Sequence, residues 1–128
     1  MDKKTKITLD ELLRRKEQVL NAKKEKRTKA LFIPSLDGTV VITQPSMSVI
    51  QDAQGIDDPI ASDKYLVYES VTEPNLKSHE LQLAYGCGEP SDIVDMLFLP
   101  GEASQIAANA VKLAGFDGRV TPVEEIKN

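Results

Sequence analysis

The single histidine and the single cysteine of the chain, His79 and Cys87, lie eight residues apart in the segment VTEPNLKSHELQLAYGCGEPSDIVDML, residues 71–97. A cysteine nucleophile needs an adjacent base, and the base needs a third group that orients it. The segment shows no such third group, and His79 is expected in the first turn of a helix, either exposed to solvent or capping it. The sequence therefore favours a protein that is not an enzyme.

Acidic residues could form a metal site, and glycines could form a phosphate-binding loop. Four aspartates lie close together and could hold a divalent cation: Asp52, Asp57, Asp58 and Asp63. They lack the ligand spacing and the closing bidentate glutamate of an EF-hand loop, so a solvated turn is the better interpretation. The glycines around Cys87 match neither the GxxxxGK[ST] nor the GxGxxG phosphate-binding pattern. We expect no metal ion and no cofactor.

Charge is divided unevenly along the 128 residues. Residues 1–30 contain 11 Lys and Arg and 5 Asp and Glu, whereas residues 31–128 contain 5 and 15. Because the N-terminal segment is basic and the rest of the chain is acidic, we expect electrostatic contact, either between copies of the chain or with a separate partner. The densest basic run is made of Lys23, Lys24, Lys26, Arg27 and Lys29. It could attract phosphates without selecting a sequence, but no aromatic residues are interleaved to stack on bases, so we expect a solvated tail or an acidic protein partner rather than nucleic acid.

Composition indicates one globular domain in the cytoplasm. Hydrophobic residues make up 41% of the chain and charged residues 28%, which is ordinary for a globular protein. No apolar run approaches the roughly 20 residues of a membrane-spanning helix, and the charged N-terminus does not resemble a secretory signal. One cysteine fits a reducing compartment.

The first element that could position a binding surface is a helix near the N-terminus. Thr8 followed by Glu11 forms a capping box, which predicts a helix beginning at residue 9. Its apolar residues fall within an arc of roughly 120°: Leu9, Leu12, Leu13, Val19 and Leu20. This narrow stripe suits one docking surface, and the polar residues 21–29 follow it as a helical or frayed tail.

A β-hairpin is expected next. Asp37-Gly38 stands between two apolar runs, which is typical of a two-residue type I′ turn. Such a turn would pair Leu36 with Thr39, and Ile33 with Ile42. Pro34 lacks an amide hydrogen, so its strand is expected at an edge of the sheet.

The remainder of the chain is expected to be helical. Residues 46–60 predict a short helix followed by an acidic turn, and Ser62 is the expected cap of a helix that Glu73-Pro74 ends. Ser78 is the expected cap of the next helix, and Gly86 its left-handed terminator.

Two more helices complete the expected core. Residues 92–99 are apolar on every side, so this helix is buried within the fold or between copies; its edges around Val94 and Phe98 are candidate binding surfaces. Pro100-Gly101 separates it from the last helix, which ends at Gly115. The apolar face of that last helix spans roughly 160° and contains Ala103, Ile106, Ala107, Ala110, Val111, Leu113 and Ala114.

The expected architecture is an α+β, helix-rich single domain. It has one β-hairpin at about residues 30–43, a C-terminal helical subdomain and an N-terminal helix that can project from the domain. We divide the chain into a basic N-terminal helix and tail (1–29), an α+β core (30–116) and a C-terminal tail (117–128). A small domain that exposes apolar helix faces and separates its basic residues from its acidic ones is expected to bind other molecules.

A series of short motifs between residues 67 and 116 resembles one known family. In order, these are VYESV, EPNL, ELQLAYG, EPSDIV, LPGE and LAGF. Their order and spacing are similar to those of the XkdN-like tail assembly chaperones of long-tailed phages and prophages of Gram-positive bacteria, and the likeness extends over residues 7–116.

The resemblance implies a non-enzymatic assembly factor that binds the tape measure protein, prevents its helices from aggregating and helps to recruit tail tube subunits. Such a protein works in the host cytoplasm, leaves before the tail is complete, and can also be made as a longer frameshifted product. Candidate partner-binding residues are Leu9, Leu12, Leu13, Val19, Leu20, Lys23, Lys24, Lys26, Arg27, Val94 and Phe98. A homo-oligomer is a further possibility. Two alternatives stay open: a structural component of the tail, and a small prophage regulator that binds nucleic acid.

Overall fold

The computed structural model describes residues 5–125, and it divides the chain into two units. Residues 27–117 form one unit, which we call the core unit. Residues 1–26 and 118–128 belong to the other, of which residues 5–26 and 118–125 are described.

A three-stranded antiparallel sheet and five α-helices build the core unit, which confirms the α+β class. The strands are β1 (Thr28–Ile33), β2 (Gly38–Thr43) and β3 (Val71–Glu73), in the order β1-β2-β3. The strand before Pro34 is therefore an edge strand, as predicted.

The hairpin turn differs from the prediction. Ile33 pairs with Gly38, and a 3₁₀ turn from Pro34 to Leu36 connects the strands. Asp37 adopts a left-handed conformation with φ of 47°, so only the first residue of the Asp-Gly pair has the expected positive φ. Proline begins a helical turn easily because its φ is already fixed. The predicted pairings of Leu36 with Thr39 and of Ile33 with Ile42 are therefore wrong, because Ile33 pairs four positions earlier, with Gly38.

The first two helices of the core unit are α3 (Met47–Gln54) and α4 (Pro59–Ser70). α4 begins earlier than predicted because Asp58, in the acidic turn, accepts hydrogen bonds from the amides of Ile60 and Ala61. Proline at the first helical position favours the same start. Ser62 is not the cap; its hydroxyl donates to the carbonyl of Ala53 at 2.8 Å.

α4 also ends differently from the prediction. The helix stops at Ser70, and the next three residues form β3, which pairs with β2 next to a bulge. The prediction that the helix runs on to Glu73-Pro74 is therefore wrong. Ile42 faces Val71 in this pairing, and both side chains are buried.

The remaining helices are α5 (His79–Ala84), α6 (Ile93–Leu97) and α7 (Pro100–Leu113). Ser78 accepts a hydrogen bond from the amide of Leu81 at 3.2 Å, and Gly86 has a φ of 68°, so both predicted ends of α5 are confirmed. Gly115, with a φ of 98°, follows the end of α7 as predicted.

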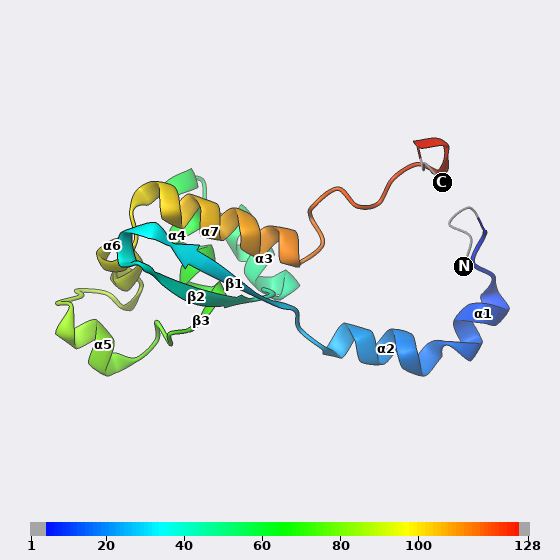
Figure 1. The fold of residues 1–128 in the computed structure, drawn as a ribbon, viewed down its shortest axis with the longest axis horizontal. Helices are drawn as coiled ribbons and strands as arrows, with labels where there is room; N and C mark the ends of the chain where they lie inside the picture. The colour runs from blue at the N-terminus through cyan, green and yellow to red at the C-terminus, as the bar shows by residue number, and fades with distance from the viewer. Residues whose placement is uncertain (1–4, 126–128) are drawn as a thin grey trace. The chain divides into compact units, whose positions relative to one another are not determined.

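The core lies between the sheet and the helices (Figure 1). α7 packs against α4 and also contacts β1 and β2. Ala107 and Ala110 of α7 are buried, and such small side chains allow a neighbouring helix to approach closely. The largest fully buried apolar side chains are Ile42, Leu76, Ile93, Ile106, Val67 and Val94.

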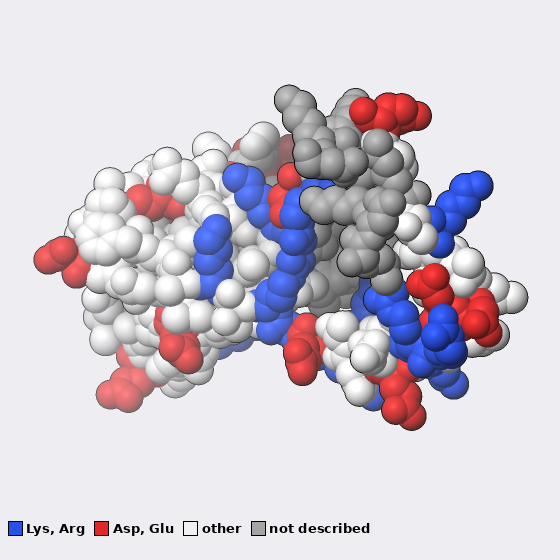
Figure 2. Space-filling view, turned by 45° about the vertical axis from the view of Figure 1, so that its right-hand side comes forward, with Lys and Arg blue, Asp and Glu red and all other residues white. Residues whose placement is uncertain are grey.

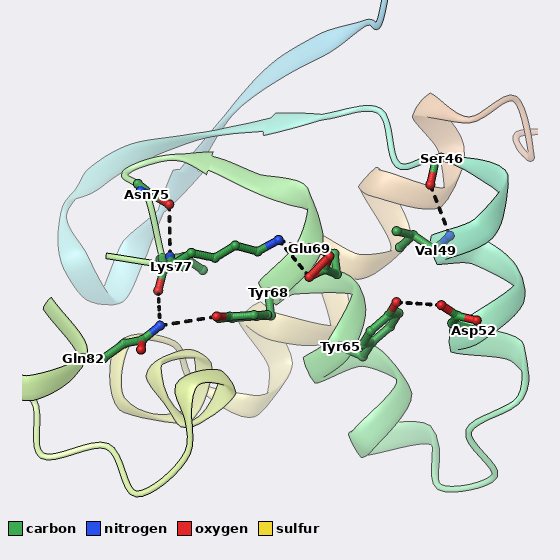
Figure 3. Close-up of polar contacts among 10 residues, drawn as sticks. Ser46, Val49, Asp52, Tyr65, Tyr68, Glu69, Asn75, Lys77 and Gln82 are labelled. Atoms are coloured by element: carbon green, nitrogen blue, oxygen red, sulfur yellow. Dashed lines mark hydrogen bonds and ion pairs between the residues drawn. The ribbon is translucent and has the colours of Figure 1, made fainter. Parts of the chain in front are cut away.

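Polar contacts fix α3 and α5 against α4 (Figure 3). The hydroxyl of Tyr65 on α4 lies 3.1 Å from the carboxylate of Asp52 on α3. The side-chain amide of Gln82 on α5 donates to the hydroxyl of Tyr68 and to the carbonyl of Leu76, at 3.3 and 2.9 Å. Since Gln82 is buried, these bonds satisfy an amide that would otherwise be costly to bury.

The N-terminal segment, residues 5–26, contains two short helices in place of the single predicted one. These are α1 (Leu9–Arg14) and α2 (Lys16–Lys24), with the break at Arg15. The hydroxyl of Thr8 accepts from the amide of Glu11 at 3.1 Å, which confirms the predicted N-cap. No proline or glycine marks the break. At the other end of the chain, residues 123–125 form a single 3₁₀ turn.

Candidate functional site

Five apolar side chains of α1 and α2 are exposed to solvent. The exposed fractions of Leu9, Leu12, Leu13, Val19 and Leu20 run from 36% to 75%. We call these five residues the N-terminal stripe. Neither helix has a buried residue, although aliphatic side chains of this size gain about 1.5–3 kcal/mol each when fully buried. The stripe is therefore a surface that would gain free energy from a partner.

The basic run divides into two parts with different surroundings. Lys23 and Lys24 occupy the last turn of α2, where cations interact favourably with the helix dipole, and Lys26 is exposed beyond it. The guanidinium of Arg27 instead donates to the carbonyl of Leu113 at the end of α7. Lys29 lies 3.1 Å from the side-chain oxygen of Asn109. The last two cations of the run thus join β1 and the residue just before it to α7, a structural role that their sequence positions do not reveal. Figure 2 shows the exposed charges of both signs.

Val94 and Phe98 are buried, with 0% and 5% of their surface exposed. The prediction that they form an exposed edge is therefore wrong. Phe98 leaves the helix in an extended conformation, so its ring turns into the core, and the exposed apolar residues of this region are Met96 and Leu99, at 51% and 60%.

The two buried side chains form the floor of a cavity of about 390 Å³ in the core unit, which we call the α4–α7 cleft. Its walls come from the first turns of α4 and α7 and from α6. Ile60, whose side chain is 72% exposed, lines it together with Asp63, Lys64 and Ala103.

An ion-pair cluster holds one wall of this cleft. The ammonium of Lys64 lies 3.1 Å from the carboxylate of Asp92 and 2.7 Å from that of Asp95. The hydrogen bond to Asp95 raises the pKa of Lys64, although partial burial opposes this. The amide of Glu89 donates to Asp92 at 2.9 Å, and this bond, followed by the contact with Lys64, lowers the pKa of Asp92. Asp63 adds another carboxylate, so the cleft has an acidic rim.

Glu102 fixes the start of α7. One carboxylate oxygen accepts from the hydroxyl of Ser35 at 2.6 Å and from the amide of Leu99 at 2.9 Å. The other accepts from the amide of Ser35 at 3.0 Å. The hydroxyl contact is the main reason that the pKa of Glu102 is lowered. The hairpin turn and α7 are thereby locked together beside the sheet.

The residues first considered for chemistry have ordinary structural surroundings. His79 is exposed in the first turn of α5, and Cys87 is half-buried against the core. Asp52 accepts from Tyr65, and Asp58 caps α4. Over residues 5–125, no group of three or more His, Cys, Asp or Glu is placed to hold a metal ion. Within the same range, no helix is long and apolar enough to span a membrane.

Comparison with known families shows which protein family the chain belongs to. The family model of the phage XkdN-like tail assembly chaperone protein matches residues 51–127, more than half of the chain. The chain belongs to this family. No curated protein and no solved structure matches it.

The matched region of this XkdN-like chaperone includes α4 to α7 and therefore the whole α4–α7 cleft. The N-terminal stripe lies before it. Sequence reasoning missed Ile60 and Lys64, which line the cleft, and considered Asp63 only as a member of an acidic cluster. The available signal was a lysine among apolar residues, Lys64, preceded by a capping aspartate and a proline at the start of α4.

Proposed function

We propose that this XkdN-like chaperone binds helices of the phage tape measure protein and keeps them from aggregating before the tail tube forms around them. The exposed N-terminal stripe is the observation that carries this proposal. A tape measure protein is long and helical, and an apolar helical face is well suited to cover part of such a chain.

The basic side chains beside the stripe supply attraction during encounter. Lys23, Lys24 and Lys26 are exposed around the end of α2, and charges at the rim of an interface act mainly on association rate. Arg27 contributes less because α7 holds its guanidinium. The protein performs no covalent chemistry in this role, works in the host cytoplasm and is absent from finished particles. Tail tube subunits are its second partner.

The experiment is co-expression of the tape measure protein with the full chain, followed by affinity capture. Replacing Leu12 and Leu13 by Asp places charge in the middle of the stripe, so capture is expected to fall at least about tenfold, since each buried leucine contributes about 1.5–3 kcal/mol. Leu83→Asp is the matched control because Leu83 is 65% exposed on α5. Capture that is equal in both variants would remove the stripe from the mechanism.

The alternative of a structural tail component makes a different prediction about particles. Purified phage particles are expected to lack this chain, by mass spectrometry, if it is a chaperone. A stoichiometric amount in the particles would favour the structural component instead.

A further inference from the structure

We propose that the α4–α7 cleft of one molecule receives the N-terminal stripe of a second copy of the same chain. This inference goes beyond the proposed function, because it adds the α4–α7 cleft as a second binding surface, gives the N-terminal stripe a second partner and needs no tape measure protein. It rests on the shape of the cleft, on its charge, and on the chemistry of the N-terminal segment.

The cleft has an apolar interior that is open to a partner's side chains. Val94 and Phe98 form its floor, and Ile60 stands at its mouth with 72% of its side chain exposed. Leu99, next to the lining residue Pro100, is 60% exposed. The cavity of about 390 Å³ has room for more than one aliphatic side chain.

The rim of the cleft is acidic. Asp63 and Asp95 line it, and its one lining cation, Lys64, already pairs with Asp95 and Asp92. The core unit as a whole contains 5 Lys and Arg and 13 Asp and Glu. An apolar ligand with a basic border is therefore the complementary partner for this site.

The N-terminal segment has this chemistry. Residues 1–26 contain 9 Lys and Arg and 5 Asp and Glu. Leu12 and Leu13 of the stripe are 48% and 65% exposed, directly before the cations Arg14 and Arg15. One chain thus carries both halves of an interface: a basic, apolar helical segment and an acidic, apolar cleft.

If each of two copies places its stripe in the cleft of the other, they form a closed dimer. If each copy places its stripe in the cleft of a further copy, a longer assembly forms. In either arrangement the stripe is covered while no client is present. Association would thus bury the five exposed apolar side chains of α1 and α2, and exposed apolar patches of this kind otherwise favour aggregation.

The first test is the mass of the purified full-length chain in solution, measured by light scattering over a range of concentrations. The mass is expected to rise above the monomer value of 14.1 kDa as concentration increases. Ile60→Asp and the double variant Leu12→Asp, Leu13→Asp are each expected to weaken association about tenfold or more, by placing a carboxylate at an acidic or apolar contact. Leu83→Asp and Val120→Asp are matched controls, since both residues are exposed outside the two surfaces.

The second test identifies the contact itself. In a Cys87→Ser background, Leu13→Cys and Ile60→Cys molecules are mixed and treated with a short bis-maleimide cross-linker. A heterodimer is expected in the mixture, well above the yield from Leu13→Cys mixed with Leu83→Cys.

A monomer at every concentration, association that neither surface variant weakens, or no excess of the heterodimer would each overturn the proposal. A cross-link formed within single molecules of the double variant Leu13→Cys, Ile60→Cys, with none between molecules, would overturn it as well. None of these results bears on tape measure capture, because no client is present in either test.

Discussion

Ser70 is fully buried at the end of α4, and its hydroxyl is the one buried side-chain polar group without a hydrogen-bond partner in the part of the chain that the structure describes. A buried hydroxyl without a partner costs about 1–3 kcal/mol. The position lies where α4 gives way to β3, in the middle of the apolar core.

Ser70→Ala is expected to leave the free energy of unfolding unchanged or to raise it by up to about 1 kcal/mol, because it removes an unsatisfied group without opening a large cavity. Leu76→Ala provides the contrast, with an expected loss of about 2–5 kcal/mol, since Leu76 is fully buried. Urea denaturation followed by circular dichroism measures both. A loss of more than about 1 kcal/mol in the alanine variant of Ser70 would show that its hydroxyl is satisfied.

Two carboxylates make stability depend on pH. The pKa values of Asp92 and Glu102 are both lowered in the folded protein, from ordinary values of 3.8 and 4.5. Their contribution is therefore complete above these values and is lost as pH falls through the lower, folded-state pKa values.

The urea midpoint is expected to stay nearly constant from about pH 7 to pH 5 and to fall below about pH 4. Glu102→Gln should be less stable at neutral pH and should show a shallower decline in acid, because it cannot titrate. Midpoints measured at several pH values test this. A decline as steep as that of the wild type would assign the acid sensitivity to other groups.

Among the secondary-structure elements, α4 connects the most neighbours, since it packs on α7, α3, α6 and β3. Its start depends on Asp58, which accepts two backbone hydrogen bonds. Helix caps of this kind contribute about 0.5–2 kcal/mol.

Asp58→Ala is expected to lower the free energy of unfolding by about 1 kcal/mol, whereas Asp58→Asn should retain most of the cap. Both variants can be compared by thermal and urea denaturation. Equal losses in the two would attribute the effect to charge rather than to capping.

Local signals in the sequence predicted the elements better than their pairing. The caps at Thr8 and Ser78 and the glycine ends at Gly86 and Gly115 depend on a few neighbouring residues, and the structure confirms them. The pairing of β2 with β3 depends on contacts about 30 residues apart in sequence, which no local pattern contains.

Two further differences have identifiable physical causes. Pro34 starts a helical turn and moves the hairpin register by four positions. The two-residue turn that Asp37-Gly38 predicts therefore does not form. Val94 and Phe98 lie in residues 92–99, which the sequence predicts as a helix apolar on every side, and periodicity could not decide which of these side chains face the core. Because their burial could not be predicted, the α4–α7 cleft, whose floor these two side chains form, could not be predicted either.

At the scale of the whole molecule, net charge follows the division into units. The core unit is acidic and contains the cleft, whereas residues 1–26 are basic and contain the stripe. We therefore propose that the N-terminal segment of this XkdN-like chaperone makes the contacts with its client. In the absence of client, the same segment binds the α4–α7 cleft in the core unit of a second copy.

The most direct measurement of this central claim is hydrogen–deuterium exchange of the full chain, with and without a soluble helical segment of the tape measure protein. Amide exchange over residues 9–24 is expected to slow when the client binds, because the short helices α1 and α2 become stabilised against solvent. Binding that leaves exchange over residues 9–24 unchanged, with protection confined to the core unit, would contradict the account.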